Sequence, residues 1–422
     1  MARTAKQRRR FIARPREFRL LVFAICIVCA FFLSAALSVQ DAFRSEDLLL
    51  PATFIVVAFI AHGLLIASGS KADMTLLPLW TVLTGIGMSY HYRLGSFTVD
   101  SWDSLSCLSF GVAPLILVTT AILFGNGRLK YLSKSPGLWI LAAFGIGIAV
   151  LATGVTFRGS VFGPGKTTPT EFLKPLLIIG LSGLLVNHGR HIERGSRFFT
   201  AESRRTHIIV IGAWLMPGVT LICLRDLGML AATALLLGIL MTLATRRIAY
   251  PLIGIAGITA IGYLAQHTIH KAGLRISAWM NPFEAPDTYG FQIIRSLFAV
   301  FNGELFGRGV GNGLPRSIPL VETDFVYASI AEEFGWLGSM MILMIVFLII
   351  RRSLQTAESC KDAFTRLVCY GCGAMWLIQC VLHVGGVIKL IPMTGVPFPG
   401  LSTGGSALMV FAVLTGWIMA AD

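Results

Sequence analysis

Residues 20–39 read LLVFAICIVCAFFLSAALSV, twenty consecutive residues without a single charge. At 1.5 Å per residue a helix of this length spans about 30 Å, the thickness of the hydrocarbon core of a bilayer. The whole chain has the same character, because 55% of its 422 residues are hydrophobic and only 13% are charged. Ordinary soluble proteins carry about 25% charged residues. The composition therefore excludes a soluble enzyme, a disordered chain and a secreted disulfide scaffold.

Eleven more apolar runs follow, so the sequence predicts an all-α polytopic membrane protein with about twelve transmembrane helices. Lysine and arginine concentrate in alternate loops, with 23 of the 35 basic residues on the side of the N-terminal tail. The positive-inside rule makes that side the cytoplasm, with both termini cytoplasmic. The predicted spans are residues 20–39, 48–68, 76–90, 108–124, 138–151, 172–186, 208–224, 227–243, 249–265, 325–350, 367–388 and 407–421.

These spans and loops divide the chain into three parts. Residues 1–19 form a basic cytoplasmic tail, residues 20–153 an N-terminal segment of five helices, and residues 154–422 a core with one long extracytoplasmic loop at 266–323. Loop topology accounts for the formal net charge of +14, so nucleic acid is not an expected partner. The basic tail either contacts anionic membrane lipids or serves only as a topology anchor. Within the long loop, an apolar pattern at 291–301 predicts a helix that lies in the membrane interface or dips back between the spans.

Three patterns that could suggest other chemistry are weak in this context. Cys369 and Cys372 form a CxxC pair inside an apolar run, which favours packing over zinc binding. The HxxH at residues 267–270 has no acidic residue nearby, so no metal site is assigned. The glycine-rich residues 307–313 follow no βα unit and lack the Lys-Ser/Thr of a P-loop. They predict flexible backbone that can approach a ligand closely.

Ionisable residues at membrane depth are costly and are therefore functional candidates. Asp324 opens the tenth predicted span at its outer boundary. It is a candidate general base, because apolar neighbours raise the proton affinity of a carboxylate, and the alternative is a helix N-cap. Glu332 and Glu333 follow about 12 Å deeper in the same helix. There, an ion pair with a basic residue on a neighbouring helix is favoured over direct chemistry.

Further charged residues flank the outer ends of other spans. Glu171 and Lys174 are three residues apart on one helical face and are expected to pair. Arg225 and Asp226 form either a charged turn or one wall of a polar cavity. The long loop also carries basic residues that suit a pyrophosphate or carboxylate ligand: Lys271, Arg275, Arg295, Arg308 and Arg316.

Several motifs of the second half, taken in order, resemble the SEDS family of RodA/FtsW type. Residues 394–406, TGVPFPGLSTGGS, are similar to the TGxPLPFxSYGGS stretch of that family. Asp324 lies in a TDF sequence that is followed by AEEFG at 331–335, similar to TDFIFA…EELG. The other matching segments are PTEFLK at 169–174 for PSExxK, DLG at 226–228 for PDLG, GFQ at 290–292 for GYQ and GRG at 307–309 for GxG.

The chain also departs from the family pattern. Leu320 and Glu322 stand where the family has glutamate and histidine, and Gly400 and Thr403 stand where it has aromatic residues. Five predicted spans, instead of the three typical of the family, precede the motif at 169–174. The sequence is therefore identified as a divergent member with an extended N-terminal half.

This resemblance implies a peptidoglycan glycosyltransferase that polymerises lipid II at the outer face of the bacterial cytoplasmic membrane, with a class B penicillin-binding protein as partner. It implies that Asp324 deprotonates the acceptor hydroxyl that attacks the donor sugar. A divalent cation, Mg²⁺ or Mn²⁺, would suit a pyrophosphate leaving group, although the metal ligands are unknown. The candidate substrate-binding residues are Glu171, Lys174, Arg225, Asp226, Arg275, Arg308, Glu322, Thr323, Ser402 and Ser406.

Other functions fit the same sequence. A lipid II flippase or scramblase would need a path through the helices, whereas a polymerase needs only an outward cavity. A non-catalytic membrane scaffold for a transpeptidase and an O-antigen-type polymerase or ligase are further alternatives. The loop at 69–73 lacks the Asp-Arg-x-Gly signature of major-facilitator transporters. The sequence does not distinguish elongation, division or sporulation.

Overall fold

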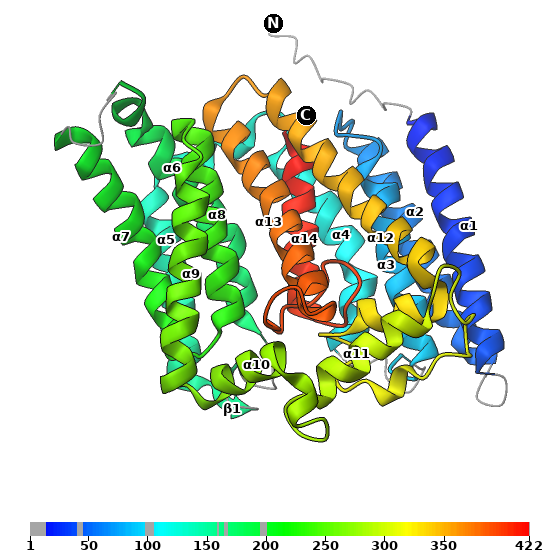
Figure 1. Ribbon diagram of the computed structural model, residues 1–422. Helices are drawn as coiled ribbons and strands as arrows, with labels where there is room; N and C mark the ends of the chain where they lie inside the picture. Colours follow the sequence, from blue (N-terminus) through cyan, green and yellow to red (C-terminus); the bar gives the residue numbers. More distant parts are fainter. Residues whose placement is uncertain are drawn as a thin grey trace, which may run out of the picture.

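The computed structural model of the protein describes residues 14–39, 45–97, 105–157, 160–163, 168–194 and 201–421. Most of these residues lie in helices that run side by side as one bundle (Figure 1). The long helices are α1 (Pro15–Ser38), α2 (Leu49–Ala67), α3 (Leu76–Arg93), α4 (Leu105–Phe124), α5 (Pro136–Thr153), α6 (Leu173–Arg194), α7 (Ala201–Cys223), α8 (Leu227–Thr245), α9 (Ala249–Thr268), α12 (Val326–Ser359), α13 (Ala363–Val387) and α14 (Gly405–Ala420). Within the described part, the only strands are β1 (Val155–Phe157) and β2 (Ser160–Phe162), which pair antiparallel.

The predicted all-α polytopic fold is confirmed, and ten helices in the described ranges are long and apolar enough to cross a membrane. The other two predicted spans correspond to α3 and α14. Sixteen of the eighteen residues of α3 and fourteen of the sixteen residues of α14 are buried. Because protein surrounds them, α3 can carry polar residues, and α14 can be only about 24 Å long. Packing of α14 on α4, and of α1 and α12 on α3, joins the N-terminal helices to the rest of the bundle.

The two ends of the bundle differ in construction (Figure 1). The start of α1 and the end of α14 lie together at one end, here called the terminal end, as an even number of crossings requires. The opposite end, here called the loop end, carries the predicted long loop. That loop forms two short helices, α10 (His270–Met280) and α11 (Phe291–Asn302), and an irregular stretch up to α12. As predicted, the apolar pattern at 291–301 is helical.

The N-terminal boundary differs from the prediction. Helix α1 begins at Pro15, so residues 15–19 belong to the first helix and not to a tail. Arg14 is buried and donates from Nε to the carboxylate of Glu17 at 2.9 Å and from Nη2 to the carbonyl of Ala72 at 2.7 Å. Burial of a charge requires such partners, and they hold the start of α1 against the segment before α3. Residues 1–13 of the predicted tail lie outside the described residues.

Helix α12 is broken where the sequence predicted one continuous span. Gly335 has φ 69° and ψ −171°, which is not a helical conformation. The N–H groups of Trp336 and Leu337 instead donate to the carbonyls of Glu304 and Leu305 at 2.9 and 3.1 Å. The break thus joins α12 to the end of the loop that precedes it, because every backbone polar group at membrane depth needs a partner.

The glycine-rich residues 307–313 fill this break and do not line a ligand cavity. The N–H groups of Arg308 and Gly309 donate to the carbonyls of Glu332 and Glu333, each at 3.0 Å. The Glu332 side chain accepts from Leu314 N at 3.1 Å. The Glu333 side chain accepts from Gly311 N at 3.3 Å and pairs with Arg93 of α3 at 3.1 Å. A Cβ at Gly307 would lie only 2.2 Å from the Glu333 carbonyl oxygen, so close packing, not ligand approach, explains this glycine.

Candidate active site

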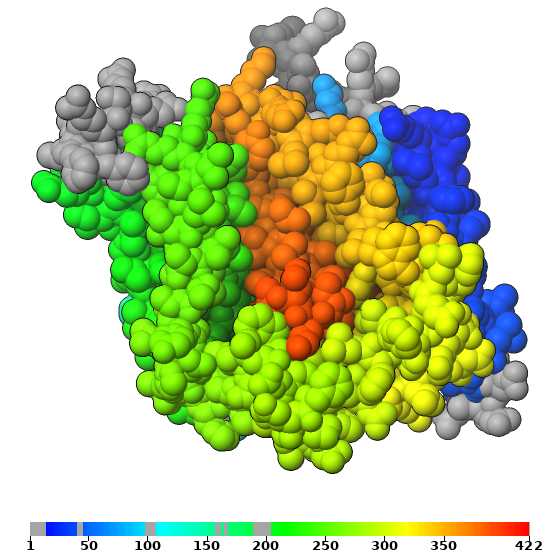
Figure 2. Space-filling model, viewed as in Figure 1, coloured from blue at the N-terminus to red at the C-terminus, as the bar shows by residue number. Residues whose placement is uncertain are grey.

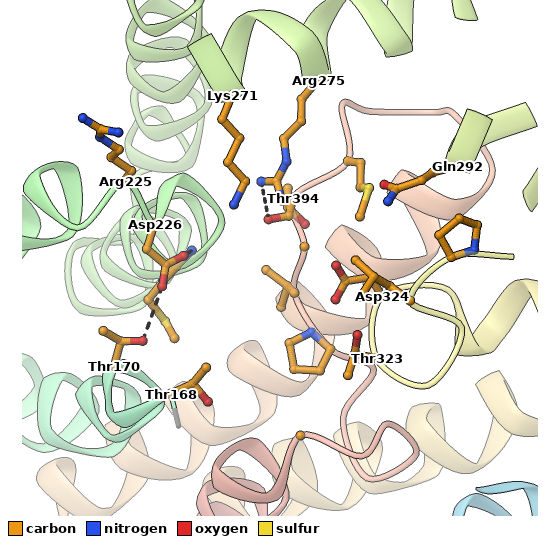
Figure 3. Close-up of a pocket in the computed structure, with 18 of the residues that line it drawn as sticks. Thr168, Thr170, Arg225, Asp226, Lys271, Arg275, Gln292, Thr323, Asp324 and Thr394 are labelled. Carbon is orange, nitrogen blue, oxygen red and sulfur yellow. Dashed lines mark hydrogen bonds between the residues drawn. The ribbon is translucent and has the colours of Figure 1, made fainter. Parts of the chain in front are cut away.

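A cavity of about 750 Å³ opens at the loop end of the bundle. Its walls come from residues 168–171 just before α6, from the start of α8, from α10 and α11, and from residues 319–324 and 393–406. Figure 3 shows Lys271 and Arg275 extending from α10 into the space between Asp226 on one side and Asp324 on the other. A volume of several hundred cubic ångströms with a few convergent polar groups is typical of a small-ligand site.

Asp324 lies at the end of a tight turn that leads into α12. The carbonyl of Leu320 accepts from the N–H groups of Thr323 and Asp324 at 3.1 and 3.0 Å. Leu320 has φ 57°, a left-handed conformation that is strained for a leucine. Phe325, and not Asp324, occupies the N-cap position of α12, and its side chain is fully buried. Asp324 thus lies one residue before the N-cap position and lines the cavity.

Two cations, Lys271 and Arg275, lie one helical turn apart on α10 and both line the cavity. Arg275 donates from Nη1 to the carbonyl of Thr394 at 3.0 Å, which fixes its guanidinium against the 393–406 segment. Burial lowers the pKa of Arg275, and the carboxylates of Asp324 and Asp226 oppose this shift. Arginine nevertheless stays protonated at any physiological pH, so the cavity holds a fixed positive charge.

Gly395 shows how close the arginine and the aspartate are. A Cβ built on this glycine would lie 2.6 Å from Nη2 of Arg275 and 3.6 Å from Oδ2 of Asp324. The guanidinium and the carboxylate thus face the same small volume, and Gly395 leaves it open. Its φ of 71° also favours glycine.

The opposite wall begins with Asp226, which is the N-cap of α8. Its Oδ1 accepts from Met229 N at 3.1 Å, and its Oδ2 accepts from the Thr170 hydroxyl at 3.3 Å. Glu171 lines the same wall, and its carboxylate pairs with the buried Lys174 behind it. Lys174 also donates to Gln379 of α13, whose Nε2 donates to the carbonyl of Pro397 at 2.9 Å. These contacts connect the cavity wall at residues 168–171 to the 393–406 segment.

Residues 393–404 form an irregular segment before α14, and two buried histidines hold it in place. His383 of α13 donates from Nδ1 to the carbonyl of Val396 at 2.8 Å, and His91 of α3 donates from Nε2 to the carbonyl of Leu401 at 2.9 Å. A carbonyl can only accept, so these ring nitrogens carry the protons. Ser402 donates to the carbonyl of Thr323 at 2.7 Å, which joins the segment to the Asp324 turn.

The structure brings together seven of the predicted site residues around the cavity: Glu171, Arg225, Asp226, Arg275, Thr323, Asp324 and Ser406. Lys174 and Ser402 lie behind the wall, where they hold Glu171 and Thr323. Two placements differ from the prediction. Arg308 is exposed on the segment that fills the α12 break. The Glu322 side chain bonds Ser96, outside the cavity.

Sequence reasoning missed several residues that line the cavity. Lys271 appeared only among the basic residues of the loop, and its i,i+4 spacing from Arg275 was the available signal. Gln292 lies in the matched GFQ motif and follows the start of α11, which directs it to the cavity. His91 and His383, which lie behind the 393–406 segment and do not line the cavity, gave no signal, because a lone histidine in an apolar run is typical of a core.

Nothing in the described ranges groups three or more His, Cys, Asp or Glu side chains closely enough to hold a metal ion. In the cavity, the carboxylates of Asp226 and Asp324 are accompanied by Lys271 and Arg275. These residues therefore do not form a metal site without further ligands.

The fold and the cavity define a polytopic helical membrane protein with a charged cavity at one end of its bundle. A family model described as "Cell cycle protein", that of the FtsW, RodA and SpoVE proteins, matches residues 137–422. The chain belongs to this family. RodA of Mycobacterium tuberculosis, a curated relative named peptidoglycan glycosyltransferase, is 32% identical and aligns over 95% of this chain and 88% of its own length. Stage V sporulation protein E of Bacillus subtilis is 31% identical over 80% of this chain and 84% of its own length.

Solved structures share the fold. A chain described under "Structural coordination of polymerization and crosslinking by a peptidoglycan synthase complex" superposes with a TM-score of 0.63 at 22% identity, covering 83% of this chain and 97% of that chain. RodA of Thermus thermophilus superposes with a TM-score of 0.57 at 20% identity, covering 83% of this chain and 96% of that chain. At these identities the likeness establishes the helical architecture.

Proposed function

We propose that this protein is a peptidoglycan glycosyltransferase that polymerises lipid II at the outer face of the bacterial cytoplasmic membrane. The observation that carries the proposal is the placement of Asp324, which shares one cavity with Lys271 and Arg275 at the loop end. The concentration of basic residues in the opposite loops supports an extracytoplasmic loop end. Membership of a family whose relatives include named peptidoglycan glycosyltransferases supports the same reaction.

Asp324 is suited to act as the general base. The acceptor hydroxyl must lose its proton as its oxygen attacks the anomeric carbon of the donor sugar, and a carboxylate within hydrogen-bond reach can take it. The turn at Leu320 and the buried Phe325 hold the backbone of Asp324 on both sides. A base held in position does not have to be ordered when the substrate arrives.

Lys271 and Arg275 are suited to hold the diphosphate of the donor. The bond that breaks joins the anomeric carbon to a phosphate oxygen, so negative charge grows on the departing diphosphate. Cations fixed beside that oxygen stabilise this charge in the transition state. Arg275 is already bound to the carbonyl of Thr394, so its guanidinium is oriented before the substrate binds.

A divalent cation stays a proposal for this reaction. Mg²⁺ is often bound by one or two carboxylates together with substrate phosphates, so the diphosphate would have to supply most of its ligands. Removal of divalent cations with EDTA, followed by addition of Mg²⁺ or Mn²⁺, tests whether polymerisation depends on one. We also propose a class B penicillin-binding protein as the membrane partner, in line with the peptidoglycan synthase complex whose chain shares this fold.

The test uses purified full-length protein, labelled lipid II and separation of the glycan products on a gel. We expect a ladder of products that disappears in Asp324→Asn, which keeps the shape of the side chain and removes the base. Glu284→Gln is the matched control, because Glu284 lies on the same loop but is exposed and does not line the cavity. A normal ladder from Asp324→Asn would overturn the proposed base. Lipid movement across vesicles without any ladder would favour a flippase instead.

A further inference from the structure

A second cavity, of about 350 Å³, lies at the terminal end of the bundle, opposite the end that carries the first cavity. Its walls are the start of α1, the segment of residues 71–75 that precedes α3, and the last turns of α12. The side chains of Arg16, Lys71 and Arg352 line it. Figure 2 shows α1 in blue and α12 in gold on the same face of the molecule, with lighter blue atoms between them.

This cavity carries a net positive charge, because its lining has three basic side chains and one acidic side chain, Asp73, which already has partners. Asp73 accepts from the N–H groups of Thr75 and Leu76 at 2.6 and 3.2 Å, at the start of α3. Its other oxygen pairs with Arg352 at 3.3 Å. The helix start and the arginine therefore satisfy the carboxylate. Arg16 and Lys71 add two cations that are exposed to the cavity.

Arg352 is fixed in place and still has donors to offer. It donates from Nε to Thr75 Oγ1 at 2.8 Å and from Nη1 to Gln355 Oε1 at 3.2 Å, and its Nη2 forms an ion pair with Asp73. A guanidinium has five N–H groups, so two are left for a ligand. Hydroxyls of Thr356 and Ser359 lie in the same wall. Oriented N–H donors, two exposed cations and hydroxyls together match a phosphate group.

The surroundings of the cavity indicate that such a phosphate belongs to a lipid. The cavity lies at the ends of helices that cross the membrane, where lipid headgroups are found. Next to it, α1 exposes the apolar side chains of Phe18 and Val22, and α12 exposes those of Phe347 and Leu354. These surfaces can contact acyl chains while the basic cavity binds the headgroup, an arrangement found for anionic lipids between transmembrane helices. We propose that this cavity binds the phosphate of an anionic phospholipid.

The test measures binding of phosphatidylglycerol to the purified full-length protein, with phosphatidylcholine as the neutral comparison, by native mass spectrometry. Arg16→Gln together with Lys71→Gln removes two cations and keeps the Arg352–Asp73 pair. We expect this variant to bind phosphatidylglycerol at least tenfold more weakly than the unmodified protein. Arg128→Gln together with Lys130→Gln is the matched control, because both residues are exposed, belong to another predicted cytoplasmic loop and do not line the cavity. The exchange Arg16→Lys with Lys71→Arg should restore binding.

Equal weakening in the cavity variant and in the control would overturn the proposal, because binding would then follow surface charge alone. No weakening in either variant would overturn it as well. A third arm adds inorganic phosphate at the same concentration as the lipid. If phosphate displaces phosphatidylglycerol, the ligand is a soluble phosphate and the assignment to a lipid is wrong. Retained glycan polymerisation in the cavity variant shows that the protein is folded and separates this result from the proposed activity.

Discussion

Gly395→Ala tests the closeness of Arg275 and Asp324 with the addition of one methyl group. The new Cβ would lie 2.6 Å from Nη2 of Arg275, whereas real Cβ atoms essentially never come closer than 3.0 Å to another heavy atom. The guanidinium must therefore retreat by about 0.8 Å to reach an ordinary contact of 3.4 Å. Its hydrogen bond to the carbonyl of Thr394, now 3.0 Å long, would be lost or strongly bent.

The expected loss follows from two contributions. A hydrogen bond to a charged group is worth about 1.5–3 kcal/mol. If Arg275 stabilises the departing diphosphate, this loss lowers the polymerisation rate by about 10- to 150-fold. The φ of 71° at Gly395 adds about 1–2 kcal/mol of strain for alanine, which destabilises the folded protein and lowers its melting temperature.

The assay follows the rate of glycan ladder formation from labelled lipid II, together with the melting temperature in detergent. Gly257→Ala is the control, because a Cβ there would meet nothing within 4 Å. The double variant Gly395→Ala with Arg275→Ala tests the mechanism. If displacement of the guanidinium is the cause, the double variant should be little slower than Arg275→Ala alone. A Gly395→Ala protein with the unmodified rate would refute the reasoning.

Four further changes have defined outcomes. Arg93→Met should lower stability by about 3–5 kcal/mol, because Glu333 stays buried without a cation. Adding Glu333→Gln should recover part of the melting temperature, and an unchanged single variant would contradict this pairing. Gly335→Ala should prevent folding of the loop end, since its Cβ would lie 2.3 Å from Gly307 N, and normal expression and activity would argue against the break in α12. His383→Leu should slow polymerisation by about tenfold, since an unpaired buried carbonyl costs about 1–3 kcal/mol, with a far-ultraviolet spectrum that stays unchanged. Lys271→Met should raise KM for lipid II, and an unaltered KM would remove Lys271 from the diphosphate site.

The sequence predicted the helices well because the bilayer imposes a simple rule on length and apolarity. All twelve predicted spans correspond to helices, including the enclosed α3, which carries polar residues, and the enclosed α14, which is apolar but short. The motifs placed Asp324 and Asp226 at the same end of the bundle, and the long loop placed Arg275 there, because each of them adjoins the end of a span on that side. The positions of these residues relative to the predicted spans were sufficient to predict that they lie at the same end of the bundle.

The rest of the site depends on contacts between residues that are far apart in the chain. His91 reaches the carbonyl of Leu401 across 310 positions, and nothing near either residue in the sequence signals it. Arg308 and the glycines around it were predicted to face a ligand. They face the break in α12 instead, and that break is visible only once the backbone of Gly335 is known. A glycine in the sequence indicates that an unusual backbone conformation is possible, but it does not identify the neighbouring residue that requires this conformation.

The interruption at Gly335 divides α12 into a short part, which begins next to Asp324, and a long part. The last carbonyls of the short part and the first N–H groups of the long part are all bound by residues 304–309 of the preceding loop. The long part exposes Met341, Met344 and Phe347, so it must follow changes of bilayer thickness or tilt. Because residues 304–309 bind both parts at the break, they brace the short part when the long part tilts. We expect the position of Asp324 to be insensitive to the thickness of the host membrane.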